Sequence, residues 1–272
     1  MARDSDRTGS ARRFVNDDRS LSDTIGFVLT FGIIITSVGF VSTVGIGELE
    51  EFQTTQQLEN ADRTFELIAR SFDEIEESQT SVRTDAIDLN DGSIRVARTS
   101  SVDVWVNNTD TGDTYHETVP LNALVYDFQD TSIAYENGAT FRTQRDGGIR
   151  KHDPNLICTE DVAVISLVTV TSPTARQIGG EGTLRITGRR TNTSLLYPLA
   201  AKGSGNASTA NHVDLKINSD RAREWRLHFE GSDGNWNVES SSDSELSVHC
   251  GTSNDLDRVY VRRTVVEVTF SG

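Results

Sequence analysis

One segment near the start of the chain has no charged residue along its whole length. Residues 24–47 are Ile, Val, Leu, Phe and Gly with scattered Ser and Thr, until Glu48 ends the run. At about 1.5 Å of rise per residue, a helix of this length spans roughly 36 Å, and a hydrocarbon core is about 30 Å thick. The pattern therefore predicts one membrane-spanning helix, which we assign to residues 21–47.

Beyond this segment the apolar residues recur with a heptad spacing. Successive steps of 3, 4, 3, 4, 3 and 7 residues separate Leu58, Ala61, Phe65, Ile68, Phe72, Ile75 and Val82. Charged and polar residues fill the positions between them. The spacing predicts an amphipathic stalk helix over residues 48–85. Its apolar stripe must be buried, either on the β domain of the same chain or on neighbouring subunits.

From about residue 86 the apolar period changes to two, which is typical of strands. We expect strands over residues 93–99, 101–107, 123–128, 132–135, 162–170, 183–187, 213–217, 225–229 and 259–270. Turn signals such as Asn90-Asp91-Gly92 and Asn137-Gly138 separate them. Many short strands with Gly-rich turns favour a mainly antiparallel, sandwich-like domain over residues 86–272, and hence an α+β fold.

Basic residues flank the apolar segment on one side only. The first twenty residues carry Arg3, Arg7, Arg12, Arg13 and Arg19, whereas the far side has acidic residues and no basic one before Arg63. Arg and Lys near a membrane helix stay cytoplasmic, so residues 1–20 are predicted to be a cytoplasmic leader and the β domain external. A cleaved secretory signal is the alternative. Its apolar part is about 7–15 residues long and ends at an Ala-x-Ala-like site, which does not follow here.

The composition of the chain limits the classes of molecule that it is expected to bind. The net charge of −15 and a pI near 4.7 argue against nucleic acid, whose phosphates need a basic surface. Lysine occurs only at Lys151, Lys202 and Lys216. An acidic, Lys-poor chain is typical of proteins kept soluble in concentrated salt, where screening softens self-repulsion. An ordinary acidic extracellular domain is the alternative.

The predicted external part carries candidate sites of covalent modification. Cys158 and Cys250 can form a disulfide that closes a loop of about 90 residues and contributes on the order of 4 kcal/mol, and two buried free thiols are the alternative. Asn107, Asn192 and Asn206 begin N-x-S/T sequons, the acceptor sequence for N-glycosylation.

No motif in the chain indicates catalysis. The five histidines, His116, His152, His212, His228 and His249, lack metal-ligand spacing, and no nucleophile elbow is present. We therefore expect no enzymatic activity, no metal and no cofactor. A membrane-tethered hydrolase with a triad dispersed in the sequence is an alternative that rests on no motif.

The junction between the leader and the helix has a distinct pattern, with Arg19-Ser20 before Leu21 and Ile25-Gly26 shortly after it. It resembles the N-terminal region of haloarchaeal type IV pilins and pilin-like membrane-anchored proteins. That resemblance implies that a prepilin-type peptidase cleaves between Ser20 and Leu21. The bacterial pattern is absent, because position 21 is not Phe and position 25 is not Glu.

In such subunits the apolar helices leave the bilayer and pack on each other as a filament core. Gly32, Thr36, Gly39 and Thr43 fall on one helix face, where small side chains let helices approach closely, although Gly and Thr are common in membrane helices generally. Leu58, Phe65, Ile68, Phe72 and Ile75 would extend this contact. The expected function is therefore a non-catalytic cell-surface subunit, major or minor, of an archaeal type IV pilus-like filament. The alternative is a single-pass anchored protein whose external domain binds a surface or cell-envelope ligand.

Overall fold

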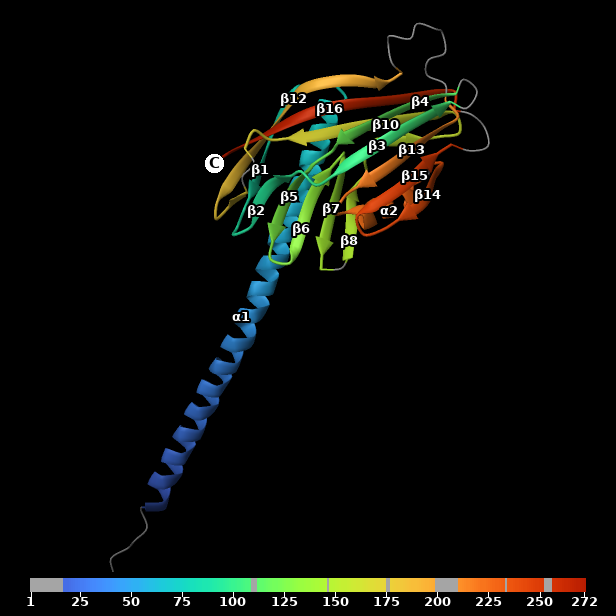
Figure 1. Ribbon diagram of the computed structural model, residues 1–272. Helices are drawn as coiled ribbons and strands as arrows, with labels where there is room; N and C mark the ends of the chain where they lie inside the picture. Colours follow the sequence, from blue (N-terminus) through green and yellow to red (C-terminus); the bar gives the residue numbers. More distant parts are fainter. Residues whose placement is uncertain are drawn as a thin grey trace, which may run out of the picture. The chain divides into compact units, whose positions relative to one another are not determined.

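The chain has an α+β fold, which confirms the class predicted from the apolar pattern (Figure 1). The computed structural model describes residues 17–108, 112–145, 147–174, 177–198, 210–232, 234–251 and 256–272, with backbone only for 17–23, 43–51 and 113. The chain divides into two compact units, Met1–Gln56 and Gln57–Gly272. An N-terminal apolar helix precedes mostly antiparallel sheets.

Helix α1 spans Asp17–Glu76, so the stalk part is shorter than the heptad spacing predicted. Val82, the last position of that spacing, is instead the first residue of a strand. The helix ends in a Schellman motif: Ser78 adopts a left-handed conformation with φ of 66°, and its N–H donates to Ile75 O over 3.2 Å. The Gln79 N–H donates to Glu74 O over 3.0 Å. These bonds use the last helical carbonyls and turn the chain out of the helix.

The strands form three sheets. Sheet A has the order β1-β12-β16-β10-β9, with bounds Val82–Asp88, Thr183–Tyr197, Arg258–Ser271, Val162–Thr171 and Leu156–Cys158. Its β10 and β16 are parallel, and its other neighbours are antiparallel. Gly188 on β12 has a specific role, because a Cβ there would overlap the ring of Phe72. The glycine therefore allows the helix to approach this strand.

Sheet B is an antiparallel sheet whose strands follow one another in sequence from β5 to β8. Its order is β11-β2-β5-β6-β7-β8, with bounds Ile178–Gly179, Ser93–Ala97, Ala123–Phe128, Thr131–Glu136, Ala139–Gln144 and Gly147–His152. The predicted Asn137-Gly138 turn joins β6 to β7, and both residues have positive φ (48° and 84°). Such two-residue turns match the twist of the strands they join.

Sheet C is also antiparallel, with the order β14-β15-β13-β3-β4. The bounds are Trp236–Ser241, Glu245–Cys250, His212–Asn218, Ser101–Asn108 and Asp113–Pro120. Alternate residues of β3, β13 and β15 are buried, so each strand has one core face and one outer face.

A second helix, α2, spans Ala222–Gly231 and replaces the strand that we predicted over residues 225–229. Trp225, Leu227 and Phe229 occupy alternate positions, which is the spacing expected of a strand with one buried face. Leu227 is nevertheless 49% exposed, so the three side chains do not share a buried face. The buried apolar residues are Ala222, Trp225 and Phe229, at helical steps of three and four.

A buried carboxylate fixes α2 to sheet B. Glu136, at the end of β6, is fully buried and accepts a hydrogen bond of 2.9 Å from Trp225 Nε1. The Arg221 guanidinium lies 3.4 Å away. Burial raises the pKa of Glu136, and the Arg221 charge and the hydrogen bond from Trp225 oppose that rise. A buried charge of this kind is tolerated only when it is paired, so this network determines where the helix docks.

The apolar stripe of α1 is buried within its own β domain. Leu58, Ala61, Phe65, Ile68, Ala69, Phe72 and Ile75 are all at most 5% exposed and share one core cluster with residues of sheets A and B. Phe72 packs edge-to-face on Tyr135 of β6, with ring centroids 5.0 Å apart. A second cluster joins sheet C, α2, β7 and the first halves of β10 and β16.

The end of α1 generates a stability prediction. A non-glycine residue in the left-handed region costs about 1–2 kcal/mol, so Ser78→Gly should relieve strain and raise the free energy of unfolding by about 1 kcal/mol. Ser78→Ala is the matched control, because it keeps a Cβ and should bring no gain. Urea denaturation of the full chain in detergent measures both. Equal destabilisation by the two variants would contradict this account of the helix end.

Candidate functional site: an exposed apolar helix and a polar sheet face

The N-terminal part of α1 exposes apolar side chains without interruption. Residues Thr24–Ser42 have a mean hydropathy of 2.2, and each of their side chains is exposed. Phe27 and Phe40, for example, are 70% and 69% exposed. By length and composition this helix can cross a membrane, as the sequence predicted; a signal sequence can have the same properties. Water is a poor solvent for such a surface.

The hydroxyl groups within this segment bond to the helix itself. Thr36 Oγ1 donates to Gly32 O over 2.7 Å, and Ser37 Oγ donates to Ile34 O over 2.8 Å. In lipid, polar groups need partners within the protein. These two hydroxyls are satisfied without a neighbouring helix or water.

The predicted ridge of small residues lies on this exposed helix. A Cβ on Gly32 or Gly39 would meet no atom within 4 Å in the described part of the chain, so packing within the chain does not require glycine at these positions. Thr36 is exposed as well. The Thr43 side chain lies outside the described part.

The residues of the predicted cleavage site lie at the start of α1. Arg19, Ser20 and Leu21 are described by backbone only, within α1, and residues 1–16 of the leader lie outside the description.

The heptad positions beyond this segment are already occupied. Leu58, Phe65, Ile68, Phe72 and Ile75 pack in the β domain of the same chain, which decides between the two partners that the sequence left open. They are not available to neighbouring subunits in this fold.

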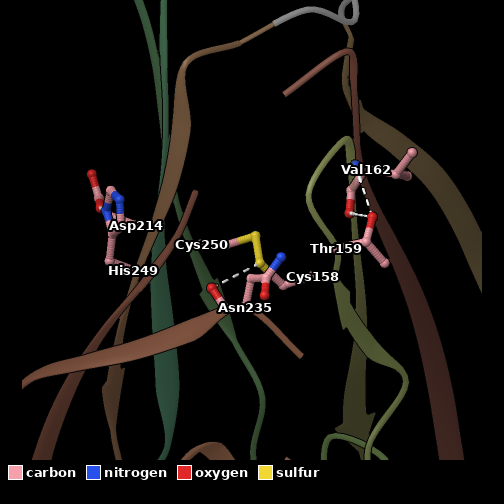
Figure 2. Close-up of a disulfide and its surroundings, with 7 residues drawn as sticks. All are labelled: Cys158, Thr159, Val162, Asp214, Asn235, His249 and Cys250. Carbon is pink, nitrogen blue, oxygen red and sulfur yellow. Dashed lines mark hydrogen bonds and ion pairs between the residues drawn. A yellow bond between two sulfur atoms is a disulfide. The ribbon is translucent and has the colours of Figure 1, made fainter. Parts of the chain in front are cut away.

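The two cysteines are joined in a disulfide (Figure 2). Cys158, the last residue of β9 in sheet A, bonds to Cys250, the last residue of β15 in sheet C. Their Cα atoms are 5.9 Å apart, and their positions differ by 92 in the sequence. Both are buried, so the bond is a covalent link between two sheets inside the core.

The sequons differ in their surroundings. Asn192 is exposed on β12, beside a register shift in its pairing with β16. Asn107 is partly engaged: its Nδ2 donates to Asp214 Oδ2 over 3.0 Å and lies 3.1 Å from His212 Nε2. Asn206 lies outside the described residues. Of the two described acceptors, Asn192 is therefore the more accessible.

Two of the five histidines, which are scattered in sequence, meet on the outer face of sheet C. His212 and Asp214 lie on β13, and His249 lies opposite Asp214 on β15. His249 Nδ1 is 2.7 Å from Asp214 Oδ1, and His212 Nε2 is 3.4 Å from Asp214 Oδ2. One ligand-type atom from each of the three residues lies within 4.8 Å of the others. Sequence spacing does not reveal this His–Asp–His cluster, because the strand register creates it.

The other histidines have separate partners. His116 stacks on Trp105, with ring centroids 4.7 Å apart, and its Nε2 lies 3.6 Å from Asp103. His228 is buried beside Asp153, and desolvation lowers its pKa. His152 Nε2 lies 3.5 Å from Asp73 on α1.

Asp73 is a half-buried carboxylate next to other acidic groups. Desolvation raises its pKa to about 6, with the charge of His152 opposing and the charges of Glu76 and Glu77 adding to the rise. The folded protein therefore holds a proton at Asp73 to higher pH than the unfolded chain does.

Comparison with known proteins places the chain in one family. Residues 19–269 match the Family of unknown function (DUF7289), and because the match spans most of the sequence, the chain belongs to that family. No curated protein and no solved structure matches the chain.

The disulfide should be a major part of the stability of the domain. Replacing both cysteines, as Cys158→Ser with Cys250→Ser, should lower the free energy of unfolding by on the order of 4 kcal/mol, because the unfolded chain regains a long open loop. Urea denaturation followed by tryptophan fluorescence measures this. Wild-type protein treated with a reductant is the control and should shift by a similar amount. An unchanged midpoint in both would contradict the prediction.

Asp73 should make stability fall as the pH rises. The folded pKa of Asp73, about 6, exceeds the ordinary value of 3.8. Its contribution to the free energy of unfolding is therefore full below pH 4 and is lost as the pH rises through 6. Asp73→Asn should therefore match wild type near pH 4 and exceed it by roughly 1–3 kcal/mol above pH 7. Asp91→Asn, on the exposed turn after β1, is the control. A wild-type advantage at pH 8 would overturn the prediction.

Proposed function

We propose that this member of the DUF7289 family is a non-catalytic cell-surface protein of the type IV pilin-like class, held or assembled through its N-terminal helix. The observation that carries the proposal is the uninterrupted exposed apolar surface of residues 24–42, which directly follows the basic junction at Arg19. An apolar helix with this exposure requires either lipid or other helices around it.

The disulfide supports an external location for the β domain. Disulfides persist in oxidising compartments, and the Cys158–Cys250 bond is buried within the core of sheets A and C. The arginines before the helix and the acidic residues after it favour the same orientation, with the leader in the cytoplasm.

The packing of α1 limits where subunits can touch. Because the stripe from Leu58 to Ile75 is used within the chain, most of the apolar surface of α1 that is open to helix contacts between subunits lies before Leu58. The ridge of Gly32, Thr36 and Gly39 offers such a contact, since small residues allow close backbone approach. Filament assembly through this ridge is our main proposal. A single-pass anchor that does not polymerise is the second candidate. The hydroxyls of Thr36 and Ser37 are compatible with it, because they bond to carbonyls of their own helix and need no neighbouring helix in lipid.

Processing at the junction tests the proposal. We would express the full chain in a haloarchaeal host with its own prepilin-type peptidase and measure the intact mass and the N-terminal peptide. The expected mature start is Leu21. Arg19→Ala should abolish cleavage, because the basic residue lies two positions before the cleaved bond, whereas the control Arg13→Ala should leave cleavage unchanged.

Fractionation of the same cells separates the two candidates. Processed protein in sheared surface material would support filament assembly, and Gly32→Leu should then move it to the membrane fraction. Retention of processed protein in membranes would favour the anchored form. An intact leader in wild type would overturn the pilin-like assignment.

A further inference from the structure

The outer face of sheet C carries a compact set of metal-ligating groups. His212 and Asp214 are two residues apart on β13, so their side chains point to the same face. In the antiparallel register Asp214 pairs with His249 on β15, and His212 pairs with Asn107 on β3. Figure 2 shows the Asp214 and His249 side chains next to each other. Three adjacent strands thus supply one cluster.

The spacing of the ligand atoms suits one small ion. Zn–N and Zn–O bonds are about 2.0–2.2 Å long, so two ligands of one tetrahedral ion are about 3.4 Å apart. The atoms of the His–Asp–His cluster lie within 4.8 Å of one another. Side-chain rotation must therefore bring the widest pair of ligand atoms closer by on the order of 1 Å.

The backbone under the cluster is held firmly. The alternate residues Val213, Leu215, Val248 and Cys250 are all at most 1% exposed and face the core. His249 immediately precedes Cys250, whose disulfide links β15 to β9. The cluster is therefore built on rigid strands, as a preorganised site requires.

The side chains themselves remain accessible. Those of His212, Asp214 and His249 are 29%, 29% and 25% exposed, so an ion can enter and water can complete its coordination. Asn107 Nδ2 donates to Asp214 Oδ2 over 3.0 Å, which orients the carboxylate as partners of metal ligands commonly do.

We propose that His212, Asp214 and His249 bind one divalent transition-metal ion of the Zn²⁺ type, with Asn107 as a positioning residue and with water in the remaining coordination positions. Two imidazoles and one carboxylate form a mixed nitrogen and oxygen set, which suits Zn²⁺, Co²⁺ or Ni²⁺. Ca²⁺ and Mg²⁺ prefer oxygen ligands alone. The site is independent of the N-terminal helix and hence of the proposed function.

A Zn²⁺ titration of the full chain tests this site. Protein purified in detergent with its disulfide intact would be stripped with a chelator, dialysed and titrated by calorimetry. We expect one Zn²⁺ per chain. His212→Gln and His249→Gln should each weaken binding by at least 10-fold, by comparison with the 10- to 100-fold losses seen when only the partners of metal ligands are removed.

His116→Gln is the matched control, because His116 lies on neighbouring β4 beside a carboxylate but outside the cluster. It should bind Zn²⁺ as wild type does. Circular dichroism checks that each variant folds. No binding by wild type, or equal binding by wild type and both cluster variants, would overturn the proposal.

A second measurement needs no variant. Co²⁺ added to the stripped wild-type chain should give visible bands that are shifted from those of aqueous Co²⁺ and that saturate at one ion per chain, because imidazole and carboxylate ligands replace water around the ion. The weak spectrum of six-coordinate aqueous Co²⁺ would contradict the site even if the variants failed to fold.

Discussion

Burial of one helical stripe organises this protein. The residues of α1 from Leu58 to Ile75 enter a core that sheets A and B share, so the second half of the helix is an internal element of the β domain. Each large side chain buried there contributes about 1.5–3 kcal/mol of transfer free energy. Because this stripe is used within the chain, most of the exposed large apolar side chains on the described part of the helix lie in the segment that has the composition of a membrane span.

Arginine side chains bind the acidic and carbonyl groups at the end of that helix. Glu76, at 1% exposure, pairs with Arg262 Nη2 over 2.7 Å and accepts a hydrogen bond from Asn155. Arg190 donates to the Ile75 carbonyl over 3.0 Å. The Glu136–Arg221 pair is similar, so both of these buried glutamates meet a planar guanidinium that can serve more than one acceptor.

Among the predicted strands that were found, β13 has strictly alternating apolar and polar residues and β3 nearly so, which is the clearest strand signal in the sequence. Strands with few apolar residues gave no such signal. Gly147–His152, for example, is strand β8 at the edge of sheet B, and its neighbour β7 provides the pairing. Within β16 the buried positions change from odd at Val259 and Val261 to even at Val266 and Val268, because the two halves face different cores. A pattern read along one strand cannot show which core lies against each half.

Local order was therefore determined by the sequence: the apolar segment and its flanking charges, the heptad stripe, the α+β class and turns such as Asn137-Gly138. These depend on periodicity and backbone preference, which act over a few residues. Tertiary structure decided the Cys158–Cys250 bond, the helical state of Trp225 and its neighbours, the partner of the α1 stripe and the His212–Asp214–His249 cluster. Each of these depends on groups far apart in sequence, and only strand register and core packing bring such groups within bonding distance.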